Sequence, residues 1–270
     1  MNLQMKNNKF HYRSIWISDT HMGTKHCHAD SLINFLSSTD SEYLYLVGDI
    51  IDLWGMKKSI FWPRQHTEIL KLIQLKADSG TKVIFTPGNH DSAFHAFSGK
   101  SIGNIQVESS TVHRSHDGRS LLVLHGDQID SLMQSQVGYW LNLFGDVGYD
   151  FILYFNYHLR RLRKIMGMKH WSLASFIKNN LKNAMNHVST FENLLASLAR
   201  EHKVDGVICG HIHYPRNRKV NAIDYYNTGD WVEHCTALVE TKCGEIKLIH
   251  WAEVENEEDI KNNIDKSIAA

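Results

Sequence analysis

The sequence predicts an α/β fold in which helices cover the faces of a sheet and a helical segment is inserted late in the chain. Three observations support this expectation. Short β-rich apolar runs alternate with stretches of helical periodicity, polar residues directly follow these runs, and a long helix-rich interval separates two of them. Alternation of strand and helix is typical of a sheet with helices packed on its faces.

The first half of the chain contains the alternating elements. Apolar runs rich in β-branched and aromatic residues predict four strands, within 13–18, 43–49, 81–91 and 119–127. Apolar residues at helical spacing predict two helices, over 29–38 and 63–80. The second helix has Pro63 near its start and Gly80 just past its end, where each residue type is favoured.

The second half begins with an interval, residues 128–203, that is rich in helix formers and aromatic residues. A crossover between parallel strands needs only about a dozen residues, so we expect this interval to hold an inserted helical lid. Strand-like runs then return, at 204–210, 224–229, 236–241 and 245–251. The expected organisation is a core formed by 1–127 and 204–252, a lid over 128–203, and a polar tail over 253–270.

Composition indicates a globular protein without an excess of either charge. Hydrophobic residues make up 43% and charged residues 21%, and Lys plus Arg equals Asp plus Glu at 29 each, so no global field favours a nucleic acid polymer. Four cysteines without CxxC spacing fit a reducing compartment better than a disulfide scaffold. Since neither a signal peptide nor an apolar run of membrane-spanning length is present, we expect a cytoplasmic location.

Polar residues gather where the predicted strands end. In an α/β sheet the carboxyl ends of parallel strands meet in one crevice, so side chains that follow five different strands are expected in one place. These candidates are Asp19 and His21, Asp49 and Asp52, Asn89, His90 and Asp91, His125, and His211 and His213.

Carboxylate, imidazole and amide oxygen together suit divalent cations such as Mn, Fe or Zn. Seven candidate ligands exceed the needs of one ion, whereas two ions that share one carboxylate, about 3.5 to 4 Å apart, would use them all. Paired ions at this spacing clamp the oxygens of a displacement at phosphorus. Each motif alone is more typical of an exposed turn, and only the occurrence of all five in order indicates a metal site.

The segments DTH, GDIID, GNHD, HGD and GHIH resemble the signature segments of the calcineurin-like metallophosphoesterases over about residues 14 to 251. The resemblance implies a four-layer αββα sandwich and two metal sites bridged by Asp49. The remaining implied ligands are Asp19, His21 and His213 at one site, and Asn89, His125 and His211 at the other. It also implies that His90 sits beside the phosphate or leaving group with Asp52 orienting its ring, although a loop-capping carboxylate is the alternative for Asp52.

The segments YLVGDIIDLW and NTGDWVEHCTALVE, together with the long interval after His125, are similar to the UDP-2,3-diacylglucosamine pyrophosphohydrolases of lipid A synthesis. That branch implies hydrolysis of UDP-2,3-diacylglucosamine to UMP and 2,3-diacylglucosamine 1-phosphate, with manganese as the expected metal. Known members carry Arg where His90 stands. A phosphodiesterase or phosphatase acting on a nucleotide or another amphipathic phosphoester is therefore an alternative, and a scaffold that has lost catalysis is a third class.

The predicted lid has more apolar surface than docking one helix face requires. Its apolar residues at helical spacing between 143 and 166 suit a slot for lipid tails or a membrane contact, or a buried helix or dimer interface. The basic residues within 160–164 suit peripheral contact with an anionic inner membrane surface, or a solvated helix end. Lys178 and Lys182 share a helix face, and we hypothesise that they bind the substrate's phosphates or sugar. The sequence leaves the oligomeric state open.

Overall fold

Two β-sheets packed face to face form the centre of the described chain. The computed structural model describes residues 9–130 and 174–251, with side chains described from 186 onwards in the second range. The apolar stripe and basic run of the predicted lid and the polar tail therefore lie outside the described residues, as do the side chains of Lys178 and Lys182.

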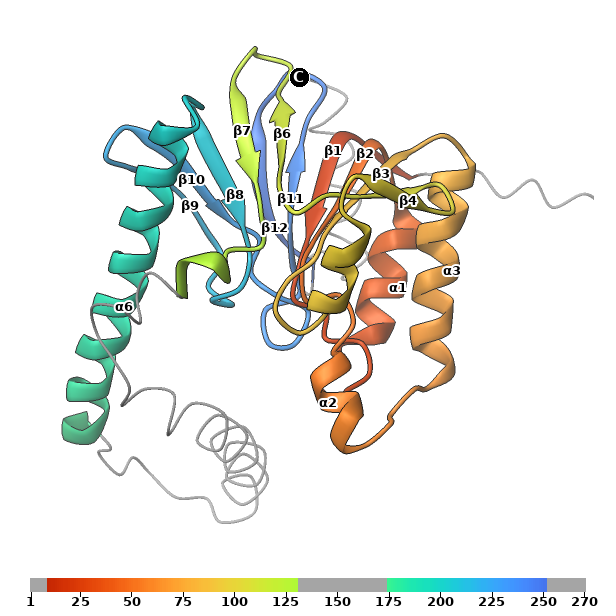
Figure 1. Cartoon of the computed structure of the whole chain (residues 1–270), viewed down its shortest axis with the longest axis horizontal. Coiled ribbons are helices and arrows are strands. Elements are labelled where there is room, and N and C mark those ends of the chain that lie inside the picture. Colours follow the sequence, from red (N-terminus) through yellow and green to blue (C-terminus); the bar gives the residue numbers. More distant parts are fainter. Residues whose placement is uncertain (1–8, 131–173, 252–270) are drawn as a thin grey trace, which may run out of the picture. The chain divides into compact units, whose positions relative to one another are not determined.

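The first sheet has seven strands in the order β12-β11-β1-β2-β3-β5-β4. In chain order its strands are β1 (Phe10–Ile17), β2 (Thr39–Val47), β3 (Lys82–Thr86), β4 (Lys100–Ile102), β5 (Ile105–Val107), β11 (Thr236–Glu240) and β12 (Ile246–His250). Strands β1, β2, β3 and β5 pair in parallel. Helices α1 (Ala29–Ser38) and α3 (Arg64–Asp78) cover the outer face of this sheet (Figure 1).

The second sheet has five strands in the order β6-β7-β8-β10-β9. Its strands are β6 (Thr111–Arg114), β7 (Ser120–Val123), β8 (Gly206–Cys209), β9 (Arg216–Val220) and β10 (Ile223–Asn227). Strands β7, β8 and β10 pair in parallel, although β7 and β8 are far apart in the sequence. Two short helices, α2 (Leu53–Lys58) and the 3-10 helix η1 (Ser92–Phe97), follow β2 and β3.

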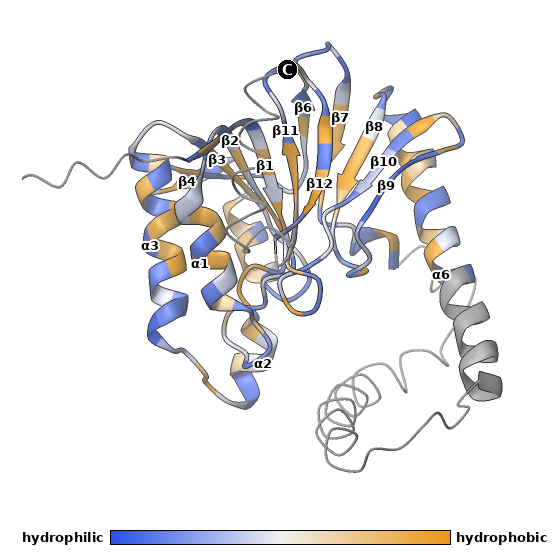
Figure 2. Cartoon of the chain, turned by 180° about the vertical axis from the view of Figure 1, so that it is seen from behind, coloured by the Kyte–Doolittle hydropathy of each residue, from blue (hydrophilic) through white to orange (hydrophobic). Residues whose placement is uncertain are grey.

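Alternation along the strands builds two apolar layers. On β1, Ile15 and Ile17 pack with the layer under α1 and α3, whereas Trp16 between them joins the layer between the sheets. The second layer also contains Tyr45 from the first sheet and Ile208 from the second. Strands β8 and β11, whose residues are all buried, are mainly orange in Figure 2, because both of their faces are covered.

Helix α6 (Ala174–Glu201) ends against the second sheet. Leu195 and Ala199 in its last turns are fully buried, Glu192 pairs with Arg218 on β9, and Arg200 Nη2 donates to a backbone oxygen in the turn after β9 at 3.0 Å. The predicted arrangement of two sheets between helices is therefore confirmed.

Contacts divide the chain into two compact units, one formed by Met1–Asp127 with Glu192–Ala270 and the other by Gln128–Phe191. Both sheets belong to the first unit. The boundaries expected from the sequence for the lid and the tail stay a prediction. Among the helices of the described ranges, none combines the length and hydropathy that crossing a bilayer requires.

Candidate metal centre

The candidate residues lie after five strands, three in the first sheet and two in the second. Strands β1, β2 and β3 are mutually parallel, and so are β7 and β8. The candidates follow them in order: Asp19 and His21 after β1, Asp49 and Asp52 after β2, Asn89 and His90 after β3, His125 after β7, and His211 and His213 after β8. The loops of the two sheets meet directly, because the backbone N–H of His211 donates to Asp19 Oδ2 at 3.0 Å.

The backbone of these loops is held in a costly conformation. Positive φ angles occur at Asp19 (49°), His21 (46°), Asp49 (53°), His211 (69°) and His213 (51°). A left-handed residue other than glycine costs roughly 1–2 kcal/mol and persists only where its surroundings impose it. Gly210 shows how closely the loops approach, since a Cβ atom there would collide with the Asp19 carboxylate. Such strain is typical of functional sites.

Asp19, His21 and His213 form a first group whose potential ligand atoms all lie within 4.8 Å of one another. Asp19 Oδ1 is 3.2 Å from His213 Nε2, and the Nε2 atoms of His21 and His213 are 3.3 Å apart. Three buried or half-buried donor atoms therefore converge from two different sheets.

Asp49, His125 and His211 form a second group within the same limit. Asp49 Oδ2 lies 3.3 Å from His125 Nε2 and 3.9 Å from His21 Nε2, so the Asp49 carboxylate stands between the two groups. His125 Nδ1 is 2.9 Å from the backbone oxygen of Val47, which assigns a proton to Nδ1 and makes Nε2 the atom that would face a cation.

The donor set fits two divalent cations. Within the described chain, four buried atoms of the candidates lack a hydrogen-bond partner, namely Asp19 Oδ1, Asn89 Oδ1, His125 Nε2 and His213 Nδ1. A buried polar atom without a partner costs about 1–3 kcal/mol, and a cation would remove that cost. Carboxylate, imidazole and amide oxygen are suitable ligands for Mn, Fe or Zn.

The pKa shifts of the candidate histidines also favour bound cations. Burial opposes protonation of His213 and His125, but nearby carboxylates override it, with Asp19 raising the pKa of His213 to about 9 and Asp49 raising the pKa of His125 to about 10. Without ions, the surplus of carboxylates thus draws protons onto the imidazoles. Positive charge is what the site lacks, and bound cations would supply it.

His90 and Asp52 lie at the mouth of this cluster. His90 Nδ1 is 2.9 Å from Asp52 Oδ1, and Asp52 Oδ2 is 3.2 Å from His21 Nδ1. Burial opposes a charge on His90, but the Asp52 hydrogen bond and the Asp49 carboxylate raise its pKa above the ordinary value. Asp52 also accepts from the Gly55 backbone N–H at 2.6 Å as the N-cap of α2. The capping carboxylate and the ring-orienting carboxylate are therefore the same residue.

Asp91 is the first of two residues whose roles the sequence reasoning missed. Its buried carboxylate accepts from the backbone N–H groups of Gly88 and Ile50, both at 2.7 Å. Burial and the neighbouring Asp49 charge raise its pKa to about 6. Asp91 thereby ties the loop after β3 to the loop after β2. Asp91 is the last residue of the GNHD segment, but the spacing of residues in a sequence does not predict a contact between two loops.

Asp230 is the second missed residue. Its buried carboxylate accepts from the backbone N–H of Val232 at 2.8 Å, lies 2.6 Å from His234 Nδ1, and lies 3.7 Å from His213 Nδ1. Burial disfavours the charge, but these hydrogen bonds and His213 lower its pKa to about 2. At 3.7 Å the Asp230 carboxylate acts on the His213 ring through its charge and not through a hydrogen bond. The available signal was the polar NTGD that follows a predicted strand.

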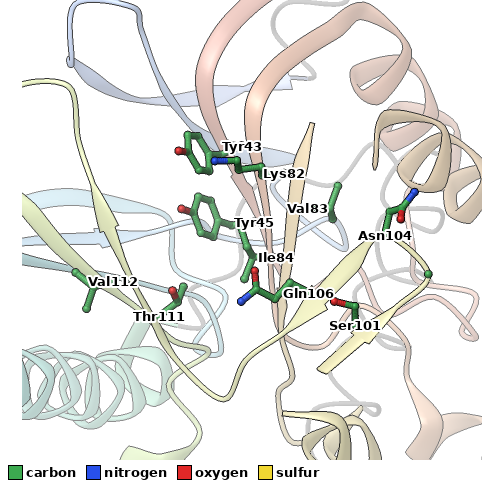
Figure 3. Close-up of a pocket in the computed structure, with 11 residues that line it drawn as sticks. Tyr43, Tyr45, Lys82, Val83, Ile84, Ser101, Asn104, Gln106, Thr111 and Val112 are labelled. Atoms are coloured by element: carbon green, nitrogen blue, oxygen red, sulfur yellow. The ribbon is translucent and has the colours of Figure 1, made fainter. Parts of the chain in front are cut away.

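A cavity of about 450 Å³ lies away from the candidate ligands, and none of them lines it. Its walls come from β2, β3, β4, β5 and β6, and the rings of Tyr43 and Tyr45 stand one above the other along β2 in Figure 3. Their ring centroids are 6.2 Å apart with planes at 11°. The candidate ligands therefore lie in the loop cluster and not in this cavity.

Comparison with known proteins relates the same loops to one family. A family model described as calcineurin-like phosphoesterase matches residues 12–215, which include every candidate ligand. Two proteins named UDP-2,3-diacylglucosamine hydrolase are similar, one from Blochmanniella pennsylvanica at 27% identity and one from Porphyromonas gingivalis at 29%. These matches cover 42% and 41% of this chain and 46% and 44% of the relatives.

A DNA polymerase II small subunit from Methanothermobacter thermautotrophicus is similar at 28% identity over 46% of this chain and 32% of its own length. The chain thus spans less than half the length of each of these curated relatives.

Proposed function

The chain belongs to the calcineurin-like phosphoesterase family, and on that premise we propose that it hydrolyses a phosphoester or diphosphate bond with two divalent cations, manganese first among the candidates. The observation that supports this most strongly is the meeting of six donor residues from four loops, Asp49 among them, while the Oδ1 atom of Asn89 in a fifth loop is buried without a hydrogen-bond partner. The complete set favours an enzyme over a scaffold that has lost catalysis, because a scaffold has no need of strained, unsatisfied ligands.

Each ion has its own group of residues in this proposal. Asp19, His21 and His213 would hold one ion, with Asp49 shared between both. Asn89, His125 and His211 would hold the other. When bound, such ions supply charge stabilisation at the phosphoryl oxygens and lower the pKa of water.

His90 acts on the substrate itself. Its Nδ1 is engaged by Asp52, so Nε2 is the atom that can donate to a phosphoryl oxygen or to the leaving oxygen. The raised pKa keeps the ring protonated over a wider range, which suits a donor. Trp54 packs beside the ring, with centroids 5.0 Å apart, and limits its movement and its contact with water.

UDP-2,3-diacylglucosamine is the substrate that we propose. Water would add to the α-phosphorus and the bond to the bridging oxygen would break, giving UMP and 2,3-diacylglucosamine 1-phosphate. The two relatives named UDP-2,3-diacylglucosamine hydrolase support this choice. The proposal includes action in the cytoplasm at the inner membrane face, with acyl chains held by the lid, manganese as metal, and Lys178 and Lys182 on the phosphates or sugar.

A second candidate rests on His90. The branch that acts on this nucleotide sugar carries Arg at that position, whereas this chain keeps the histidine that the wider superfamily shares. A phosphodiesterase or phosphatase acting on a nucleotide or another amphipathic phosphoester would retain it.

Hydrolysis by the metal-stripped protein, reloaded with Mn²⁺, tests both candidates. We expect UMP release from UDP-2,3-diacylglucosamine only with metal, and a kcat lowered about 10²- to 10⁴-fold in His90→Ala. Hydrolysis of bis(p-nitrophenyl) phosphate without UMP release would favour the second candidate. Inactivity toward both compounds with Mn, Fe and Zn would contradict the enzyme proposal itself.

A further inference from the structure

Helix α2 and the segment after it present apolar side chains to solvent. Ile60 is 77% exposed and Trp54 is 46% exposed, and the half-buried Phe61 follows. Lys57 and Lys58, at the end of α2, are exposed beside them. These five residues are called the α2 surface below. Figure 1 shows α2 and the following segment extending beyond the ends of α1 and α3.

The exposed segment is fixed at its base. Trp62 Nε1 donates to Thr67 Oγ1 at 3.0 Å, and the ring of Trp62 packs edge-on against His66 with centroids 5.3 Å apart. His66 is 1% exposed and its Nδ1 accepts from the Gly23 backbone N–H at 3.1 Å. Ile60 is therefore exposed on a segment whose base is fixed by these contacts. Burying Ile60 against another part of the chain would break them.

Positive charge dominates the stretch between Asp52 and Glu68, although Arg64 at its end lies beside the exposed carboxylates of Asp30 and Glu68. The stretch from Leu53 to Thr67 contains Lys57, Lys58 and Arg64 and no acidic residue, although the whole chain has a net charge of +0. Lys25, from the loop after β1, adds a fourth cation 5.8 Å from the centre of the Phe61 ring.

We propose that the α2 surface docks on an anionic lipid bilayer. Exposed Trp, Ile and Phe beside lysines match the chemistry of the interface, where apolar tips enter the headgroup region and ammonium groups meet lipid phosphates. A protein partner would be favoured by a groove or by mixed charges, and the α2 surface has cations only. Because Trp54 lies against His90, docking places the bilayer beside the candidate centre. The inference rests on the proposed action at the inner membrane face and names the surface that makes this contact, but it does not depend on which phosphoester is hydrolysed.

Co-sedimentation of the full chain with vesicles tests this docking. The probes are phosphatidylcholine vesicles and vesicles with 30% phosphatidylglycerol. We expect binding to the anionic vesicles that weakens from about 0.05 to 0.5 M salt, since screening shortens the reach of surface charge. Ile60→Asp should lower partitioning at least about tenfold, and the Lys57→Glu, Lys58→Glu double variant at least about 25-fold, from about fivefold for each lysine.

Matched variants on β4 are the controls. Ile102, 39% exposed, and the exposed Lys100 offer the same side-chain types on the edge of the first sheet. Ile102→Asp and Lys100→Glu should leave vesicle binding unchanged, and all variants should keep the far-UV circular dichroism of the wild type. Docking is overturned if the wild type binds neither vesicle, binds both equally, or binds with an affinity that the α2 variants do not change.

Activity toward a water-soluble phosphodiester without vesicles separates this inference from the proposed function. Ile60→Asp should retain that activity. Vesicle binding by a protein that hydrolyses nothing would support the docking and contradict the proposed function. Hydrolysis without vesicle binding would contradict the docking and support the proposed hydrolysis.

Discussion

The carboxylate of Asp52 contacts two imidazole rings and the N-terminus of a helix. One oxygen holds His90 Nδ1 at 2.9 Å and caps α2, while the other lies 3.2 Å from His21 Nδ1. These contacts keep the pKa of Asp52 well below its usual range despite burial. The permanently charged carboxylate therefore positions a donor ring and a candidate ligand ring at once.

Asp52→Asn should lower kcat about 10- to 100-fold at saturating metal, the usual effect of losing a partner behind a functional histidine. It should also shift the alkaline limb of the pH profile to lower pH, because Asp52 raises the pKa of His90. Steady-state kinetics between pH 5 and 10 measure both, with the exposed Asp30→Asn as control. An unmoved alkaline limb would contradict the positioning role.

For individual residues, the sequence predicted which candidate ligands lie close together, and it did not predict the hydrogen bonds that hold their loops. The candidate ligands follow strands whose parallel pairing could be expected, but the strands belong to two sheets, and the packing of these sheets, which brings the loops together, could not be expected from the pairing. The roles of Asp91 and Asp230 could not be expected, because each depends on backbone N–H groups of a loop that only the folded chain brings near.

A buried polar network joins the elements at the other end of the sheets. Glu240 on β11 lies 2.9 Å from Nε2 of His113 on β6, and His113 Nδ1 is 2.9 Å from Tyr45 Oη on β2. Glu240 also accepts from Ser14 Oγ at 2.8 Å and from Arg13 Nη1 at 2.9 Å. The network links strands of both sheets, so it aligns the two halves of the loop cluster.

This network makes stability depend on pH. Burial disfavours a charged Glu240, but hydrogen bonds from His113, His116 and Ser14 override it and lower its pKa to about 2. A carboxyl with a lowered folded pKa adds stability above its unfolded pKa and loses it as pH falls through the folded value. The free energy of unfolding should therefore fall between about pH 5 and pH 2.

Glu240→Gln should lower the free energy of unfolding by about 2 kcal/mol at pH 7, because the hydrogen bonds lose their charged acceptor. It should also flatten the acid dependence. Urea unfolding at pH 7 and pH 3 measures both effects, with the exposed Glu245→Gln as control. An acid dependence as steep as that of the wild type would rule out Glu240 as its source.

Apolar elements were predictable, even the four-residue strands β7 and β8, whereas polar strands such as β6 and β9 and the shortest elements were not. The strand expected within 43–49 is real, but β2 starts at Thr39, directly after α1, because pairing with β1 extends it into polar residues. Strands β4 and β5 have three residues each, too few for periodicity to appear, and exist through pairing with each other and with β3. Helix α2 follows from its Asp52 cap, and its six residues give no periodic signal.

In the molecule as a whole, the candidate centre lies where two sheets meet. The first sheet supplies Asp19, His21, Asp49 and Asn89, and the second supplies His125, His211 and His213. Each of the two proposed ligand sets combines residues from both sheets, although a further possible metal group, His21, Asp49 and His90, comes from the first sheet alone. The chemistry that we propose depends on this packing, which explains why the buried layer between the sheets and the Glu240 network matter to function.

Metal content per chain tests the dinuclear centre most directly. The protein is stripped, dialysed against excess Mn²⁺, freed of unbound metal and measured by plasma mass spectrometry, with Asp49→Ala alongside. We expect two ions per wild-type chain and a loss of tightly bound metal in Asp49→Ala, whose circular dichroism stays that of the wild type. One ion or none in the wild type, or two ions retained by Asp49→Ala, would contradict the dinuclear centre.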